Sequence, residues 1–143
     1  MDFLTALRIS GSGLGVERTR VNLATSNLAN AETTRTAAGG PYKRLDPVIA
    51  AVQFPAELGE AQVASNPPLQ VEVSSIVADN TPGKRVYSPG HPDADPEGFV
   101  TFPNVNPVHE VVNLMSASRS YEANATAIET LKNMASRGLD IAR

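Results

Sequence analysis

Residues 106–139, NPVHEVVNLMSASRSYEANATAIETLKNMASRGL, determine the fold because they predict one long amphipathic helix. Asn106 is a residue type that caps helix amino termini, and Pro107 fits a first helical turn. Alternating steps of three and four residues then connect Val111, Leu114, Ser118, Tyr121, Ala125, Ile128, Ala135 and Leu139, with Lys132 as the one serious misfit. The stripe is widened by Val108, Val112, Met115, Leu131 and Met134. A helix over 108–137, weakened near Gly138, would be about 45 Å long at 1.5 Å per residue.

The start of the chain predicts a second, weaker helix. Leu7, Leu14, Val21 and Leu28 recur every seven residues, which keeps them on one side of a helix. The neighbouring lines are mostly small or polar, and glycines at positions 11, 13 and 15 each cost about 1 kcal/mol relative to alanine. This arm should be poorly helical alone. Its similar length allows antiparallel pairing with the other helix.

Proline divides the chain into three parts. All 11 prolines lie between Pro41 and Pro107, and a proline inside a helix costs about 3 kcal/mol. We therefore expect an N-terminal helical arm at 1–36, a β-rich middle module with loops at 37–106 and a C-terminal helical arm at 107–143.

The middle of the chain predicts short strands and hairpins. Strand character occurs at 47–54, at 69–73 with a continuation through 75–77, at 86–87 and at 99–102. Five of the seven aromatic residues fall in this part, which predicts a small aromatic core. The predicted fold class is α+β, with long terminal helices forming a coiled-coil-like α domain and a small β-hairpin-rich middle module.

Composition argues against several classes of function. The net charge is −3 without a basic stripe, so nucleic acid is not an expected partner. Cysteine is absent, which excludes a thiol nucleophile and thiolate metal ligation. No apolar run reaches the ~20 residues of a membrane span, and the amino terminus is unlike a classical secretory signal. We expect a protein that does not span membranes and whose export leaves its amino terminus intact.

No catalytic constellation is present in the sequence. Asp93, Asp95 and Gly98 weakly resemble a calcium loop, but Pro96 interrupts it and the distal glutamate is missing, which favours a solvated turn. His91 and His109 lack a third ligand. We therefore predict no enzyme activity, no metal, no cofactor and no small-molecule substrate. A monomeric helical hairpin and a small β-domain enzyme or ligand-binding module remain the alternatives to an assembly subunit.

Two motifs resemble those at the ends of bacterial flagellar rod, hook and hook-associated axial proteins. They are SNLANA at 26–31 and MSASRSYEAN at 115–124. The middle string VYSPGHP at 86–92, followed by GFV at 98–100 and PNV at 103–105, is similar to proximal-rod subunits in particular. One departure is ETTRTAAGG at 32–40, where the broader family often has a sequence like Thr-Pro-Gly-Tyr, at the exit from the first arm.

The resemblance implies a structural subunit of the flagellar rod, the drive shaft that crosses the periplasm and transmits torque. It implies a helical assembly with copies of itself and other rod proteins, and export by the flagellar type III apparatus without a cleaved signal. Another short axial protein of the same family is the alternative.

The motifs and the stripes together define the expected assembly interface. The resemblance contributes Asn27, Leu28, Asn30, Arg119, Tyr121 and Asn124, and the stripes contribute Leu7, Leu14, Val21, Val111, Leu114, Met115, Ile128 and Leu131.

Overall fold

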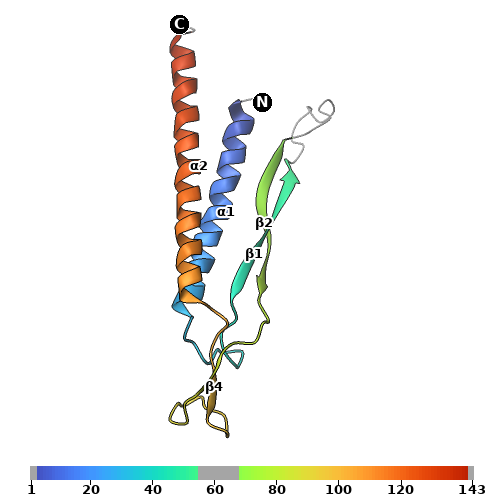
Figure 1. Ribbon diagram of the computed structural model, residues 1–143. Helices are drawn as coiled ribbons and strands as arrows, with labels where there is room; N and C mark the ends of the chain where they lie inside the picture. Colours follow the sequence, from blue (N-terminus) through green and yellow to red (C-terminus); the bar gives the residue numbers. More distant parts are fainter. Residues whose placement is uncertain (1–2, 55–67, 142–143) are drawn as a thin grey trace.

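Two long helices and two β-hairpins make up the chain, as the computed structural model shows for residues 3–54 and 68–141 (Figure 1). The elements in chain order are α1 (Phe3–Ala29), β1 (Leu45–Gln53), β2 (Leu69–Ala78), β3 (Arg85–Tyr87), β4 (Phe99–Thr101) and α2 (Pro107–Ile141). The predicted α+β class, with helices at both ends and hairpins between them, is confirmed.

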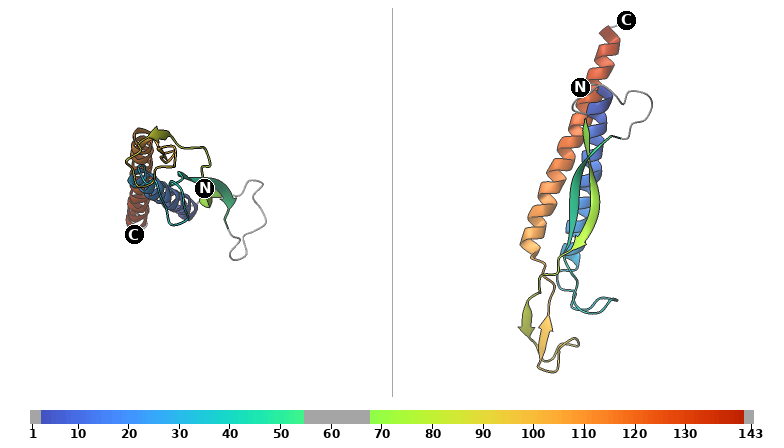
Figure 2. Two further views of the ribbon diagram at one scale, coloured as in Figure 1. Left: turned by 90° about the horizontal axis from the view of Figure 1, so that it is seen from below. Right: turned by 90° about the vertical axis from the view of Figure 1, so that its right-hand side faces the viewer.

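The helices α1 and α2 pack antiparallel, so both chain ends lie at the same end of an elongated molecule (Figures 1 and 2). Asn27 donates a hydrogen bond to Glu110, and Gly13 lies against Asn124. From one contact to the other, each helix advances 14 residues (13 to 27 and 110 to 124). The pairing therefore stays in register over about 21 Å at 1.5 Å per residue.

The start of α2 follows the sequence prediction, but its end does not. The Asn106 side-chain oxygen accepts hydrogen bonds from the Val108 and His109 amides at 3.0 and 3.4 Å, which caps the helix. The predicted end at 137 is wrong, because α2 continues to Ile141. Gly138 does not adopt the positive φ that often follows the end of a helix. A glycine inside a helix costs roughly 1 kcal/mol relative to alanine, which is not enough to end α2. The last turns of α2 extend past the start of α1 (Figure 1).

The residues buried between α1 and α2, which we call the seam, are rotated around each helix relative to the predicted stripes. On α2 the buried residues are Glu110 and Ala117, whereas Lys132 and Leu139 are exposed. On α1 the buried residues are Val16, Ala24 and Asn27, and the line from Leu7 to Leu28 is half-buried beside them. Small side chains occupy the centre of the seam because they allow the two backbones to approach, which displaces larger side chains to its flanks. The rotation also explains the Lys132 misfit, since that side chain faces solvent.

The first hairpin extends along α1 (Figure 2). Its strands pair antiparallel from Leu45 opposite Ala78 to Gln53 opposite Leu69, with an irregularity between Val48 and Ile49. The Val71 amide donates to the Ser12 hydroxyl of α1 at 3.2 Å. The strands expected at 47–54 and 69–77 are thus confirmed, and the hairpin supports the glycine-weakened helix from the side.

The second hairpin, β3–β4, lies at the opposite end of the molecule from the termini (Figure 1). Tyr87 contacts Phe99 edge-on with ring centroids 5.3 Å apart, and the Arg85 guanidinium lies 4.8 Å from the Phe99 ring centroid. Val100 beside them is buried. The expected single aromatic core is wrong, because the other aromatic residues of the middle pack separately: Tyr42 on Asn27, Phe54 near Arg8, and Phe102 near His91.

Gly13 of α1 lies against the Asn124 side chain of α2, and its replacement should destabilise the helix pair. A Cβ atom at position 13 would lie 2.8 Å from the side-chain nitrogen Nδ2 of Asn124. We expect Gly13→Ala to lower the free energy of unfolding by about 1–3 kcal/mol, the usual cost of overpacking.

Gly15→Ala is the matched control, because a Cβ there meets nothing within 4 Å. It should raise stability by up to about 1 kcal/mol through helix propensity. Urea unfolding followed by circular dichroism measures both variants. Equal stabilisation by the two alanines would show that the helices do not cross closely at Gly13.

Asp95 should make the second hairpin sensitive to acid. Its carboxylate accepts hydrogen bonds from the Phe99 amide at 2.8 Å and from Arg85 at 2.7 Å, and these contacts lower its pKa below the ordinary 3.8. A lowered pKa in the folded state means that the stabilisation is complete above pH 3.8 and is lost as the pH falls through the lower value. The Tyr87 ring resonances should report this loss by NMR, and Asp95→Asn should remove the transition. Resonances of the unsubstituted chain that stay constant down to about pH 2 would contradict this.

Candidate assembly interface

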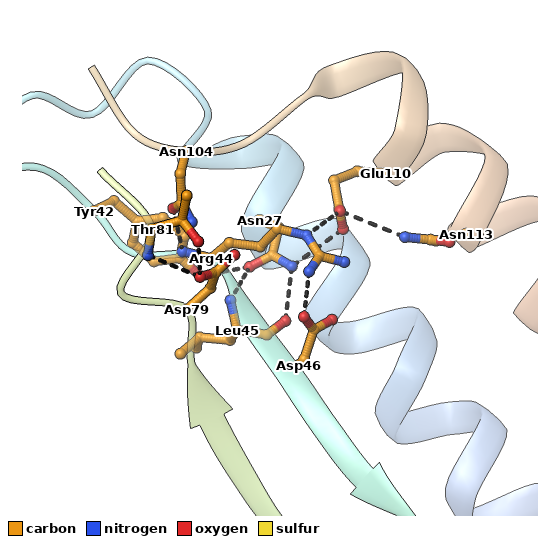
Figure 3. Close-up of polar contacts among 10 residues, drawn as sticks. All are labelled: Asn27, Tyr42, Arg44, Leu45, Asp46, Asp79, Thr81, Asn104, Glu110 and Asn113. Atoms are coloured by element: carbon orange, nitrogen blue, oxygen red, sulfur yellow. Dashed lines mark hydrogen bonds and ion pairs between the residues drawn. The ribbon is translucent and has the colours of Figure 1, made fainter. Parts of the chain in front are cut away.

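The side chain of Asn27 connects α1 to β1 and α2. Asn27 is only 1% exposed. Its oxygen accepts from the Leu45 amide and from the Tyr42 hydroxyl, both at 2.9 Å. Its nitrogen donates to the Leu45 carbonyl at 2.9 Å and to a Glu110 oxygen at 3.1 Å (Figure 3). Both donors and both lone pairs are thus used, so this buried amide leaves no polar atom unpaired.

Buried Glu110 and part-buried Arg44 form an ion pair next to Asn27 (Figure 3). Glu110 is 1% exposed, and its second oxygen accepts from Arg44 Nε at 2.7 Å and from Asn113 at 3.4 Å. Arg44 also pairs with Asp46. Burial opposes the charge of Arg44, but the hydrogen bond and charge of Glu110, helped by Asp46, raise its pKa above the ordinary value. A buried carboxylate is tolerated here because donors reach both of its oxygens.

We call Asn27, Arg44 and Glu110 the polar junction. The backbone around Arg44 extends it, because the Arg44 amide donates to the Asn104 side chain at 3.1 Å and the Arg44 carbonyl accepts from the Asp79 amide at 2.8 Å. The end of α1, the start of β1, the end of β2 and the start of α2 are therefore held at one point (Figure 3).

The exit from the first arm forms a closed loop next to this junction. The Thr36 amide donates to the Gly40 carbonyl at 2.9 Å, with Gly39 and Gly40 at positive φ. Thr34 donates to an Asp93 oxygen at 2.8 Å, which ties the loop to the β3–β4 turn. Asp93 and Asp95 are thus engaged by protein donors. Within residues 3–54 and 68–141 no group of three or more His, Asp or Glu side chains could hold a metal ion.

The three motif asparagines make contacts within the chain. Asn27 is in the polar junction, and Asn124 lies against Gly13. Asn30 donates to the Ser26 carbonyl at 2.9 Å and accepts from Thr33 at 3.2 Å, which closes the end of α1. These asparagines, expected at the assembly interface, therefore first shape the subunit itself.

Most of the other predicted residues lie on the flanks of the helix pair. The α1 stripe of Leu7, Leu14, Val21 and Leu28 is half-buried, as are Leu114, Ile128 and Leu131 on α2. The exposed members are Val111, Met115, Arg119 and Tyr121. Two grooves border the seam. One of about 310 Å³ lies against β1 and includes Leu23, Ile49 and Asn113, and one of about 280 Å³ is lined by Arg18, Val21, Ser118, Tyr121 and Glu122.

Sequence reasoning missed the residues at the centre of the seam. Val16, Ala24 and Ala117 are small or medium apolar side chains at helical spacing, a signal that was present but weaker than the leucine repeat. Glu110 and Arg44 gave no signal, because a charged residue in a sequence is ordinarily read as exposed. The burial of Glu110 depends on Arg44, a partner 66 residues away in the chain.

Comparison with known proteins gives one family. Residues 97–141 match the family profile described as Flagellar basal body rod FlgEFG protein C-terminal. The chain is 40% identical over 134 residues to the Flagellar basal-body rod protein FlgC of Salmonella typhimurium, covering 94% of this chain and 93% of the relative. It is 39% identical to the FlgC protein of Borreliella burgdorferi, with 94% and 93% covered, and 38% identical to that of Bacillus subtilis, with 96% and 97% covered.

In the described part of the chain, neither helix combines the length and the apolar character needed to cross a bilayer.

Substitutions in the polar junction should cost more than similar changes elsewhere on the same helices. Asn27→Ala removes four hydrogen bonds and leaves buried partners unpaired, and Glu110→Gln removes the buried carboxylate partner of Arg44, which then pairs only with the half-exposed Asp46. We expect each to lower the free energy of unfolding by about 2–4 kcal/mol.

The controls are Asn22→Ala and Glu129→Gln, both at exposed positions of the same helices. They should change stability by less than about 0.5 kcal/mol. Urea unfolding of the four variants gives the comparison. Losses no larger than those of the controls would mean that the junction does not hold the helices and hairpin together.

Proposed function

Because this chain belongs to the FlgC family of flagellar basal-body rod proteins, we propose that it builds the rod through the flanks of its helix pair. It is a structural subunit of the bacterial flagellar basal-body rod. It assembles with other rod proteins in the basal body. The proposal concerns which residues make those contacts and how the subunit carries load.

The observation that carries the proposal is the set of large apolar side chains left exposed on α2. Val108 is 74% exposed, and Val112, Met115, Met134 and Leu139 are each more than half exposed. Apolar surface of this extent on a monomer usually marks a contact with another chain. Burial of these side chains between subunits supplies the free energy of assembly without any chemical reaction.

Assembly does not require the motif asparagines at the subunit surface. They set the shape of the subunit, and the flanking residues Leu7, Leu14, Val21 and Leu28 on α1, with Val111, Met115, Arg119 and Tyr121 on α2, meet neighbouring subunits. The half-buried residues at the edge of the seam contribute both to helix pairing within the subunit and to the contact with neighbouring subunits. They are Leu114, Ile128 and Leu131.

Torque transmission requires that force on one part of the subunit reaches the others. The polar junction supports this role, because the two helices and the first hairpin meet at one point with every donor and acceptor of Asn27 satisfied. We propose that residues 1–36 and 107–143 act as assembly arms and that 37–106 acts as a spacer that sets the distance to neighbours.

We further propose that the flagellar type III apparatus exports the chain without a cleaved signal, into the periplasmic part of the rod, and that the chain has no enzymatic activity. Membership of the flagellar rod family supports this route.

A charge placed on either stripe should abolish motility while permitting export. Leu28→Asp places the charge on the α1 flank, and Ile128→Asp places it on the half-buried side of α2. An unpaired charge buried at such a contact costs several kcal/mol, and every copy of the subunit repeats the cost. The measurement is swimming together with secretion of the variant in cells that lack the unsubstituted chain.

Lys43→Ala is the control, because Lys43 is exposed and bonds only to the Asn80 side chain among the described residues. It should leave swimming nearly intact. If both aspartate variants swim normally, the flanks are not assembly surfaces.

A further inference from the structure

The β3–β4 hairpin stands apart from the other elements of the chain. Neither of its strands packs against α1, α2, β1 or β2, and the hairpin lies beyond the end of the helix pair (Figure 1). Its own contacts hold it together, as between Tyr87 and Phe99 and between Arg85 and Asp95. We call residues 84–102 the hairpin arm. Because no helix packs on this arm, helix packing does not set its direction.

Two chain segments connect the hairpin arm to the rest of the subunit, and they meet at one point. They are residues 79–83 before β3 and 103–106 after β4. The backbones approach so closely at Gly83 that a Cβ atom there would overlap the Phe102 carbonyl oxygen. Next to this crossing, the Phe102 amide donates to the Lys84 carbonyl at 2.9 Å. A unit attached at one point can still turn about it, so a second attachment is needed to fix its direction.

Asp93 provides this second attachment. Among residues 3–54 and 68–141, every hydrogen bond or ion pair from the hairpin arm to another part of the chain involves its carboxylate. The Thr34 hydroxyl donates to one oxygen at 2.8 Å, and Arg35 lies 3.6 Å from the other. The Arg35 side chain is 76% exposed, so its ion pair contributes little. The Thr34 bond is short and its carboxylate acceptor is only 22% exposed, which makes it the main tie.

Both ends of this tie are held in place. On the side of the helices, the Thr33 amide donates to the Asn30 carbonyl at 3.1 Å, and the Thr33 carbonyl accepts from the Tyr42 amide at 3.0 Å. In the hairpin arm, the Asp93 amide donates to Nδ1 of His91 at 3.1 Å, which fixes the turn that carries the carboxylate. The tie therefore joins a fixed point near the end of α1 to a fixed point of the arm.

We propose that Thr34 and Asp93 are positioning residues that set the direction of the hairpin arm relative to the helix pair, and that the rod requires this direction. The inference rests on the proposed function, since it gives the spacer at 37–106 a defined orientation. A change of direction moves the exposed Tyr87 and Glu97 side chains relative to the flanks of the helix pair. Because a subunit in a repeated array meets several neighbours at once, arm and flanks must keep one relative position.

Substitutions of Thr34 test the tie. Thr34→Val keeps the shape of the side chain but removes the hydroxyl donor, whereas Thr34→Ser keeps the donor. Residual dipolar couplings of the purified chain measure the direction of the hairpin arm relative to the first hairpin. One alignment tensor should describe both in the unsubstituted chain and in Thr34→Ser, and the arm of Thr34→Val should need a tensor of its own. Thr36→Val is the matched control, because among the described residues the Thr36 hydroxyl bonds only to carbonyls of its own loop.

Two further measurements separate positioning from stability. The urea midpoint of the helix signal should be the same in all four chains, because the tie includes no residue of the helix pair. In cells without the unsubstituted chain, Thr34→Val should lose swimming, and Thr34→Ser and Thr36→Val should keep it. Separate tensors in the unsubstituted chain, one shared tensor in Thr34→Val, a lowered midpoint for that variant or its normal swimming would each overturn the proposal. Detection of the unsubstituted chain in isolated basal bodies distinguishes such a failure from a failure of the rod assignment.

Discussion

The fully satisfied side chain of Asn27 is the interaction on which the rest of the structure depends. Four hydrogen bonds join the end of α1 to Tyr42, to the start of β1 and to Glu110 of α2, and Glu110 in turn holds Arg44. If any one of these partners were absent, a buried polar or charged group would be left without a hydrogen-bond partner. Such a group costs about 1–3 kcal/mol or more of folding free energy. The junction thus favours one arrangement of helices and hairpin over alternatives that an apolar contact would permit equally well.

The helix pair uses different residues for pairing within the subunit and for the proposed contact with neighbouring subunits. The leucine repeat alone predicts a single surface for both. Small residues at the centre of the seam, such as Ala24 and Ala117, leave room for the two helices to approach, and Gly13 leaves room for the Asn124 side chain. The larger side chains, displaced to the flanks and to the outer side of α2, remain exposed or half-exposed. A subunit of this design holds its helix pair through contacts of its own and still keeps apolar surface for its neighbours, as a rod built from repeated contacts requires.

Much of the fold could be predicted from the sequence because it depends on local signals. The cap at Asn106, the proline-free ends and the alternation at 69–73 predicted α2, the helix pair and β2 correctly. The rotation of the seam could not be predicted, because α2 is apolar over a wide arc and the side facing α1 is chosen by small residues on both helices. Nor could Glu110 and Arg44 be found, since only the folded chain brings them together. The role of the flanks in assembly stays a prediction.

A residue-resolved reconstruction of this chain in isolated basal bodies tests the account most directly. We predict that each subunit keeps Asn27 bonded to its own Glu110 and that the stripe from Leu7 to Leu28 and the exposed side of α2 are covered by neighbouring subunits. The account would be contradicted by α1 packed on the α2 of another copy with the polar junction broken, or by both flanks facing solvent in the assembled rod.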